Sequence, residues 1–133
     1  MPEIGLFGSE GGATDTRRPY PIELQPHNVP GDPSSVAFRG EHLSACAARV
    51  IHGSVPALAW RVEIGGKSIV FTGDTNGEGD DLVRLAKNAD LLITHNAVPE
   101  GATGVERRLH MPPSVIGQIA QVVPRLYPDW CIV

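Results

Sequence analysis

The stretch "PALAWRVEIGGKSIVFTGD", residues 56–74, decides the fold class. Residues 56–64 predict a strand, and residues 60–64 within it alternate between apolar and charged side chains, as a half-buried strand does. Gly65 and Gly66 follow, and because both can adopt a positive φ they predict a tight hairpin into a second strand. That second strand is apolar on both faces at residues 69–71, which predicts a central position in a sheet.

Shorter elements flank this hairpin. The patterns predict a strand at 45–52, a helix at 80–90, a buried strand at 90–94, a helix at 112–123 and one more strand at the end of the chain. Residues 95–110 are rich in glycine and polar residues and are expected to form a loop. This order predicts an α/β fold, with one sheet and helices on one of its faces.

The first part of the chain has a different character. Residues 1–44 are dense in Gly, Pro, Ser and Asp, in a protein that has 15 glycines and 12 prolines among its 133 residues. Only a short strand near residues 22–24 is expected there. We therefore divide the chain into an extended arm or loop at 1–44 and a domain at 45–133.

Charge and cysteine content narrow the class of protein. A net charge of −4 argues against a nonspecific nucleic-acid clamp or a membrane-surface binder, since both need basic surfaces. Cys46 and Cys131 lie far apart in the sequence, which favours a reducing compartment, although two cysteines can pair. The sequence shows no signal-peptide pattern and no apolar run of membrane-spanning length, so a soluble cytoplasmic protein is expected.

Metal-capable side chains follow the predicted strands, and one more precedes the last helix: His52, Asp74, His95 and His110. Each alone has an ordinary interpretation, because an aspartate after Thr-Gly often makes a turn and a histidine after a strand often lies at the surface. Together, imidazole and carboxylate groups are the ligands that zinc prefers, and a carboxylate can bridge two ions. A catalytic zinc needs three protein ligands, so the residues alone leave both interpretations open.

Four segments in combination resemble a known family: "VIHGSVPALAWRV", "FTGDT", "AKNADLLITHNA" and "RRLHMPPSVIGQIAQ", all between residues 45 and 122. They are similar to the metallo-β-lactamase-fold hydrolases, and in pattern to the ribonuclease Z-like and arylsulfatase-like branches. The resemblance implies an αββα sandwich, of which this chain would hold one sheet with its helices. It also implies hydrolysis of an ester bond at a site with two zinc ions.

The resemblance assigns a role to each candidate residue. His52 would be a metal ligand, and Asp74 would bridge two zinc ions that activate a water molecule. His110 would protonate the leaving group or stabilise an oxyanion, with His95 in support. The substrate would be RNA or another phosphodiester, a sulfate ester or another small ester. Asn96 stands where ribonuclease Z-like members carry a glutamate, which counts against a strict tRNA-processing role.

The sequence also departs from the family. The signature H-x-H-x-D-H is absent from this chain, and no final histidine ligand follows the 112–123 helix. We therefore expect a truncated chain, the C-terminal portion of such an enzyme, with one sheet face uncovered. Such a chain is expected to form a homo-oligomer or to pack with a complementary half-domain. The alternative is a non-catalytic relic or interaction module that has lost its metals, so enzymatic activity stays open at this stage.

Overall fold

The computed structural model describes residues 4–5, 28–29, 31–32 and 34–123. The chain divides into two units, residues 1–30 and 31–133. In the first unit, β1 (Ile4–Gly5) pairs antiparallel with β2 (Asn28–Val29). The strands expected near residues 22–24 and at the end of the chain lie outside the described residues.

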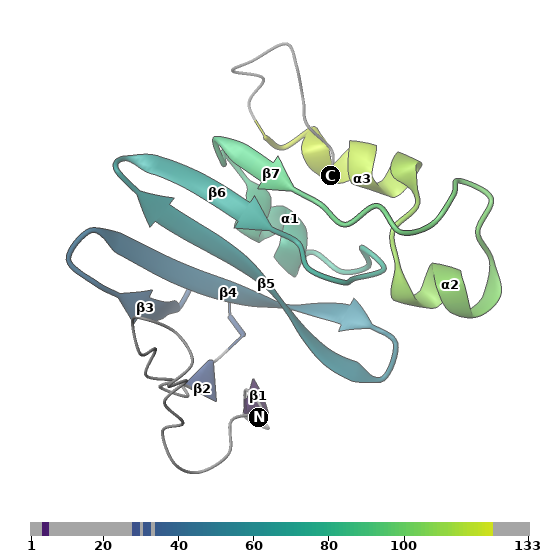
Figure 1. Ribbon diagram of the computed structural model, residues 1–133, viewed down its shortest axis with the longest axis horizontal. Helices are drawn as coiled ribbons and strands as arrows, with labels where there is room; N and C mark the ends of the chain where they lie inside the picture. The colour runs from purple at the N-terminus through teal and green to yellow at the C-terminus, as the bar shows by residue number, and fades with distance from the viewer. Residues whose placement is uncertain (1–3, 6–27, 30, 33, 124–133) are drawn as a thin grey trace, which may run out of the picture. The chain divides into compact units, whose positions relative to one another are not determined.

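The second unit is built on a five-stranded mixed sheet, in the order β3-β4-β5-β6-β7 (Figure 1). Its strands are β3 (Val36–Arg39), β4 (Leu43–His52), β5 (Val55–Ile64), β6 (Lys67–Phe71) and β7 (Leu91–Ile93). Neighbouring strands are antiparallel except β6 and β7, which are parallel. The sheet thus begins before residue 45, because β3 and the start of β4 precede that residue. The extended arm expected at 1–44 stays a prediction for those of its residues that the structure does not describe.

The Gly-Gly hairpin predicted between β5 and β6 is confirmed. Gly65 and Gly66 have φ values of 57° and 74°, and Ile64 pairs with Lys67 across the turn. A two-residue turn with both φ values positive matches the twist of the flanking strands. β6 lies between β5 and β7 in the sheet, so its predicted interior position is also confirmed.

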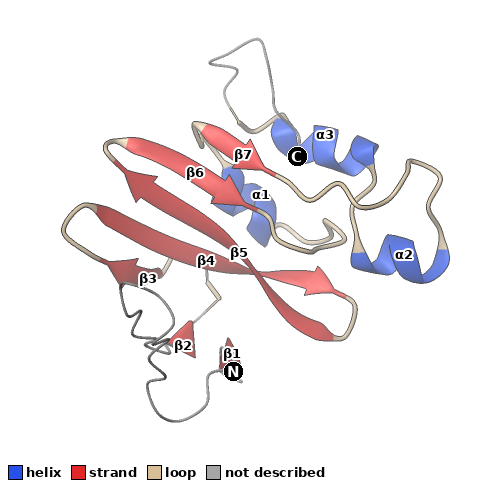
Figure 2. Cartoon of the chain, in the orientation of Figure 1, coloured by secondary structure: helices blue, strands red, loops and turns tan. Residues whose placement is uncertain are grey.

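In the part of the chain that the structure describes, three helices accompany the sheet (Figure 2). They are α1 (Asp81–Ala86), α2 (Gly104–Leu109) and α3 (Pro113–Ala120). α1 is shorter than the predicted 80–90 helix because Asn88 adopts a φ of 58°, outside the helical range. The prediction of a plain loop over 95–110 is wrong, since α2 lies within it. α2 buries none of its side chains and so has no apolar stripe to reveal it in the sequence.

The hydrophobic core lies between one sheet face and the helices. Ala48 of β4, Ala59 of β5 and Val70 of β6 are fully buried on this face. They pack in one cluster with α1 and α3, through the side chains of Leu82, Leu85, Ile116 and Ile119. Alanine at the centre of the face lets helix and sheet approach closely, and the expected arrangement of helices on one face is confirmed.

The opposite sheet face carries apolar side chains that are open to solvent in the described part of the chain, although Ala45 and Ala47 on the same face are buried. Strand register places the side chains of Leu43, Ile64 and Leu91 on this face, alternating with those that point into the core. Ile64 is 46% exposed, and Phe71, which shares the face, is 40% exposed. None of the described helices is long and apolar enough to cross a membrane.

Candidate metal centre

The strand directions bring the candidate residues to one edge of the sheet. β4 and β6 both pair antiparallel with β5, and β6 is parallel to β7, so β4, β6 and β7 run in the same direction. Their carboxyl ends therefore share an edge. His52 ends β4, while Asp74 and His95 follow β6 and β7. Side chains in loops at such an edge are well placed to bind a ligand.

The loop after β6, residues 72–79, is held by hydrogen bonds on both sides of Asp74. The Thr72 amide donates to the carbonyl of Ile93 at 3.0 Å, and the Asn76 amide donates to the carbonyl of Ile51 at 2.8 Å. Thr72 and Asn76 are buried, whereas Asp74 between them is exposed. The loop thus buries Thr72 and Asn76 in the protein and leaves the Asp74 carboxylate exposed at the edge of the sheet.

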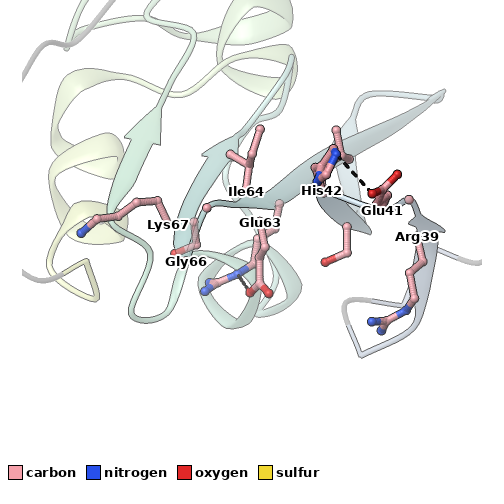
Figure 3. A pocket seen from close by; sticks show the side chains of 13 residues that line it. Arg39, Glu41, His42, Glu63, Ile64, Gly66 and Lys67 are labelled. Carbon is pink, nitrogen blue, oxygen red and sulfur yellow. Dashed lines mark hydrogen bonds and ion pairs between the residues drawn. The ribbon is translucent and has the colours of Figure 1, made fainter.

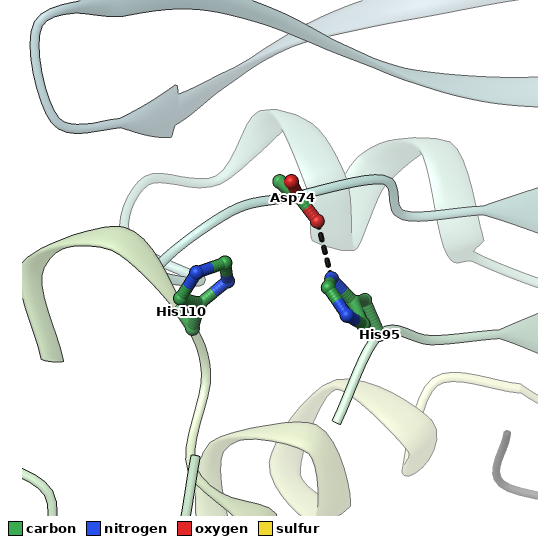
Figure 4. Close-up of side chains that lie close together, drawn as sticks. All are labelled: Asp74, His95 and His110. Atoms are coloured by element: carbon green, nitrogen blue, oxygen red, sulfur yellow. Dashed lines mark hydrogen bonds and ion pairs between the residues drawn. The ribbon is translucent and has the colours of Figure 1, made fainter. Parts of the chain in front are cut away.

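Asp74, His95 and His110 lie together (Figure 4). Each offers one ligand atom, and these atoms lie within 4.8 Å of one another. Nδ1 of His95 contacts Oδ1 of Asp74. The rings of His95 and His110 stand nearly perpendicular, with centroids 5.4 Å apart. The structure therefore brings three of the four predicted residues into one group.

His110 carries a buried nitrogen without a partner. Its Nδ1 has no hydrogen-bond partner in the described part of the chain. A buried polar atom left unpaired costs free energy, and a bound ion or water molecule at this nitrogen would remove that cost. With two imidazoles and one carboxylate, the group fits a zinc-type ion, because catalytic zinc takes three protein ligands and keeps one position open.

His52 lies beside this group but is not a member of it. Its Nδ1 lies 2.9 Å from the carbonyl oxygen of Leu109, and its ring lies 5.2 Å from that of His110 between centroids. A carbonyl only accepts, so Nδ1 carries the proton and neutral His52 keeps its lone pair on Nε2. Metal-binding histidines are commonly oriented in this way. The metal role of His52 nevertheless stays a prediction.

Contacts of the residues on both sides of His110 set its position, and the sequence did not predict these contacts. Met111 is fully buried, and a Cβ placed on Gly77 would lie 2.9 Å from its side chain. A Cβ on Gly53 would likewise lie 2.8 Å from Leu109. Glycine at these two positions lets the segment of His110 approach the ends of β4 and β6. Two glycines placed shortly after His52 and Asp74 are the sequence signal that could have indicated this.

A separate hollow lies at the opposite end of the strands and is lined partly by charged residues (Figure 3). Two of its cations have partners: Lys67 lies 2.8 Å from Asp90, and Arg61 bonds Glu63 and the carbonyl of Leu85 in the last turn of α1. None of the metal-capable group lines it. The candidate site is therefore the edge with Asp74 and not this hollow.

Solved structures with the same arrangement identify the fold. The metallo-β-lactamase fold protein YhfI of Bacillus subtilis is 26% identical, over 66% of this chain and 35% of its own, with a TM-score of 0.56. The short form of human tRNase Z is 26% identical, over 68% of this chain and 36% of its own, with a TM-score of 0.59. This chain has part of the metallo-β-lactamase fold.

A more distant structure has the same partial metallo-β-lactamase fold. Zn²⁺-bound PqqB of Methylobacterium extorquens is 16% identical over 67% of this chain, with a TM-score of 0.52. The matched region spans only 35%, 36% and 40% of the three solved chains. No protein-family model and no curated protein matches the sequence. The predicted resemblance to metallo-β-lactamase-fold proteins is confirmed at the level of the fold.

Proposed function

We propose that this chain carries part of the active site of a metal-dependent hydrolase that acts on an ester bond. The observation that carries the proposal is the group of Asp74, His95 and His110, whose ligand atoms lie within 4.8 Å at the edge where β6 and β7 end. The proposal is also supported by the likeness of the fold to that of a tRNase Z. When bound, a divalent ion such as zinc would supply a Lewis acid and a water molecule of lowered pKa.

The residues of this chain would divide the remaining work. Asp74 and His95 are about half exposed, so their ligand atoms stay open to a substrate at the edge of the sheet. His110 is partly buried beside them, where an imidazole can hold an ion or give a proton to a leaving group. A phosphodiester such as RNA is the preferred substrate class, because of the likeness to tRNase Z, with a sulfate ester second.

The alternative is a non-catalytic relic or interaction module. The absence of H-x-H-x-D-H from this sequence supports that alternative. The retained group argues against it, because a chain without metal has no need to bring ligand atoms of two imidazoles and a carboxylate within 4.8 Å of one another. The two functions differ in metal uptake, so metal binding decides between them.

The test is a zinc titration of the purified chain, with thermal unfolding as a second readout. We expect a bound ion and a higher melting temperature, since zinc at about 100 times its Kd stabilises the folded state by about 2.7 kcal/mol. Asp74→Asn should abolish both effects. Asp80→Asn is the matched control, because Asp80 is exposed and makes no capping hydrogen bond.

Substrate class is tested on the zinc-loaded protein with bis(4-nitrophenyl) phosphate and 4-nitrophenyl sulfate. Turnover of the phosphodiester that Asp74→Asn abolishes supports the preferred class, and turnover of the sulfate alone supports the second. Zinc uptake below about a tenth of an equivalent, with an unchanged melting temperature, would refute a metal-dependent function for this chain.

A further inference from the structure

Helix α2 and His110 depend on neighbouring loops for their position. α2 has six residues and buries none of its side chains, and its N-cap residue Thr103 makes no side-chain hydrogen bond. Helices this short are not stable in water by themselves. The geometry of His110, which follows α2 directly, must therefore come from ties between α2 and the rest of the protein.

One such tie runs to the loop that carries Asp74. Nη1 of Arg107 donates to the carbonyl of Asn76 at 3.0 Å. Asn76 lies two residues after Asp74, and Arg107 lies three residues before His110. The guanidinium thus joins the two loops that present these metal-capable side chains.

The accepting side of this bond is rigid. Asn76 is buried, its amide donates to Ile51, and its side-chain oxygen accepts from the Glu78 amide at 2.9 Å. A carbonyl held in this way moves little, so its hydrogen bond with Arg107 fixes the position of α2 relative to the loop. Hydrogen bonds that involve a charged donor are stronger than neutral ones, which suits a tie between two loops.

We propose that Arg107 is a positioning residue, which holds His110 against Asp74 and His95 through the Asn76 carbonyl. This rests on the proposed function in so far as the positioned group binds a metal. The neighbouring arginine provides a matched control on the same helix. Arg108 is exposed, and its side chain makes no hydrogen bond or ion pair within the described residues, so its loss should leave the site unchanged.

The first measurement is the binding of Co²⁺, whose visible absorption reports the geometry of its ligands. We expect Arg107→Met to weaken Co²⁺ binding by about tenfold and to change the spectrum, as loss of residues that orient metal ligands does. Arg107→Lys keeps one donor and should restore most of the affinity. Arg108→Met should bind Co²⁺ like the original protein.

The second measurement needs no metal and follows the proximity of the His52 and His110 rings by nuclear Overhauser effects. Ring centroids 5.2 Å apart lie within reach of the method. Arg107→Met should weaken this effect and Arg108→Met should not. If Arg107→Met keeps both the ring proximity and the Co²⁺ affinity, Arg107 has no positioning role. If the original protein binds no Co²⁺, the proposed function fails, and the ring proximity alone decides on Arg107.

Discussion

Replacement of Gly77 by alanine tests how the Asp74 loop packs against the segment of His110. Gly77 has a φ of 78°, and an added Cβ would lie 2.6 Å from Cγ1 of Val115 and 2.9 Å from the side chain of Met111. Both contacts are too short, so either the loop or the side chains of Val115 and Met111 must shift.

Two costs combine in Gly77→Ala. A left-handed conformation costs a residue with a Cβ about 1–2 kcal/mol. Forcing an extra methyl group into a packed site costs about 1–3 kcal/mol. We therefore expect the free energy of unfolding to fall by about 2–5 kcal/mol, a large share of the stability of a small domain.

The matched control is Gly79→Ala. Gly79 has a φ of 87°, and no atom lies within 4 Å of the position of its Cβ. This variant carries only the conformational cost, about 1–2 kcal/mol. The difference between the two variants in urea unfolding thus isolates the contact with Met111 and Val115. Equal losses of stability in both variants would refute the packing argument.

Three further predictions concern stability and association. The pKa of Asp90 is lowered to about 2 by hydrogen bonds from Lys67 and Ser68, so its contribution to stability is present above about pH 4 and is lost as the pH falls toward 2. In urea unfolding between these pH values, Asp90→Asn should flatten the fall in stability, and an unchanged slope would contradict this. Arg61→Met should lower the free energy of unfolding in urea by about 1.5–3 kcal/mol, because two carbonyls at the end of α1 lose a charged donor. A loss below about 0.5 kcal/mol would contradict this. Self-association stays a prediction, and we expect the chain to elute above its monomer mass and Phe71→Lys to reduce that mass. A monomer in both cases would count against association through the open sheet face.

The sheet could be predicted from the sequence because its signals are local. Alternating side chains in residues 60–64 and the Gly65-Gly66 pair determine a hairpin without help from distant residues. The exposed position of Asp74 after β6 follows from the same pattern, since the apolar run of the strand ends just before it.

The arrangement of the site could not be predicted in the same way. His95 lies 21 residues from Asp74 in the sequence, and nothing local indicates that their side chains touch. The tie from Arg107 to Asn76 spans 31 residues and ends on a backbone carbonyl, which leaves no trace in residue type. α2 was missed because its position depends on such ties and on no apolar stripe of its own.

The parallel pairing of β6 and β7 has a consequence for the order of folding. The antiparallel strands β4, β5 and β6 are joined by tight turns, so they can pair early with little loss of chain entropy. β7 must first cross over through α1, and the bond from His52 to Leu109 closes a separation of 57 residues. We therefore expect the histidines and Asp74 to come together last, so that a metal ion added during refolding would be captured only in the slowest phase.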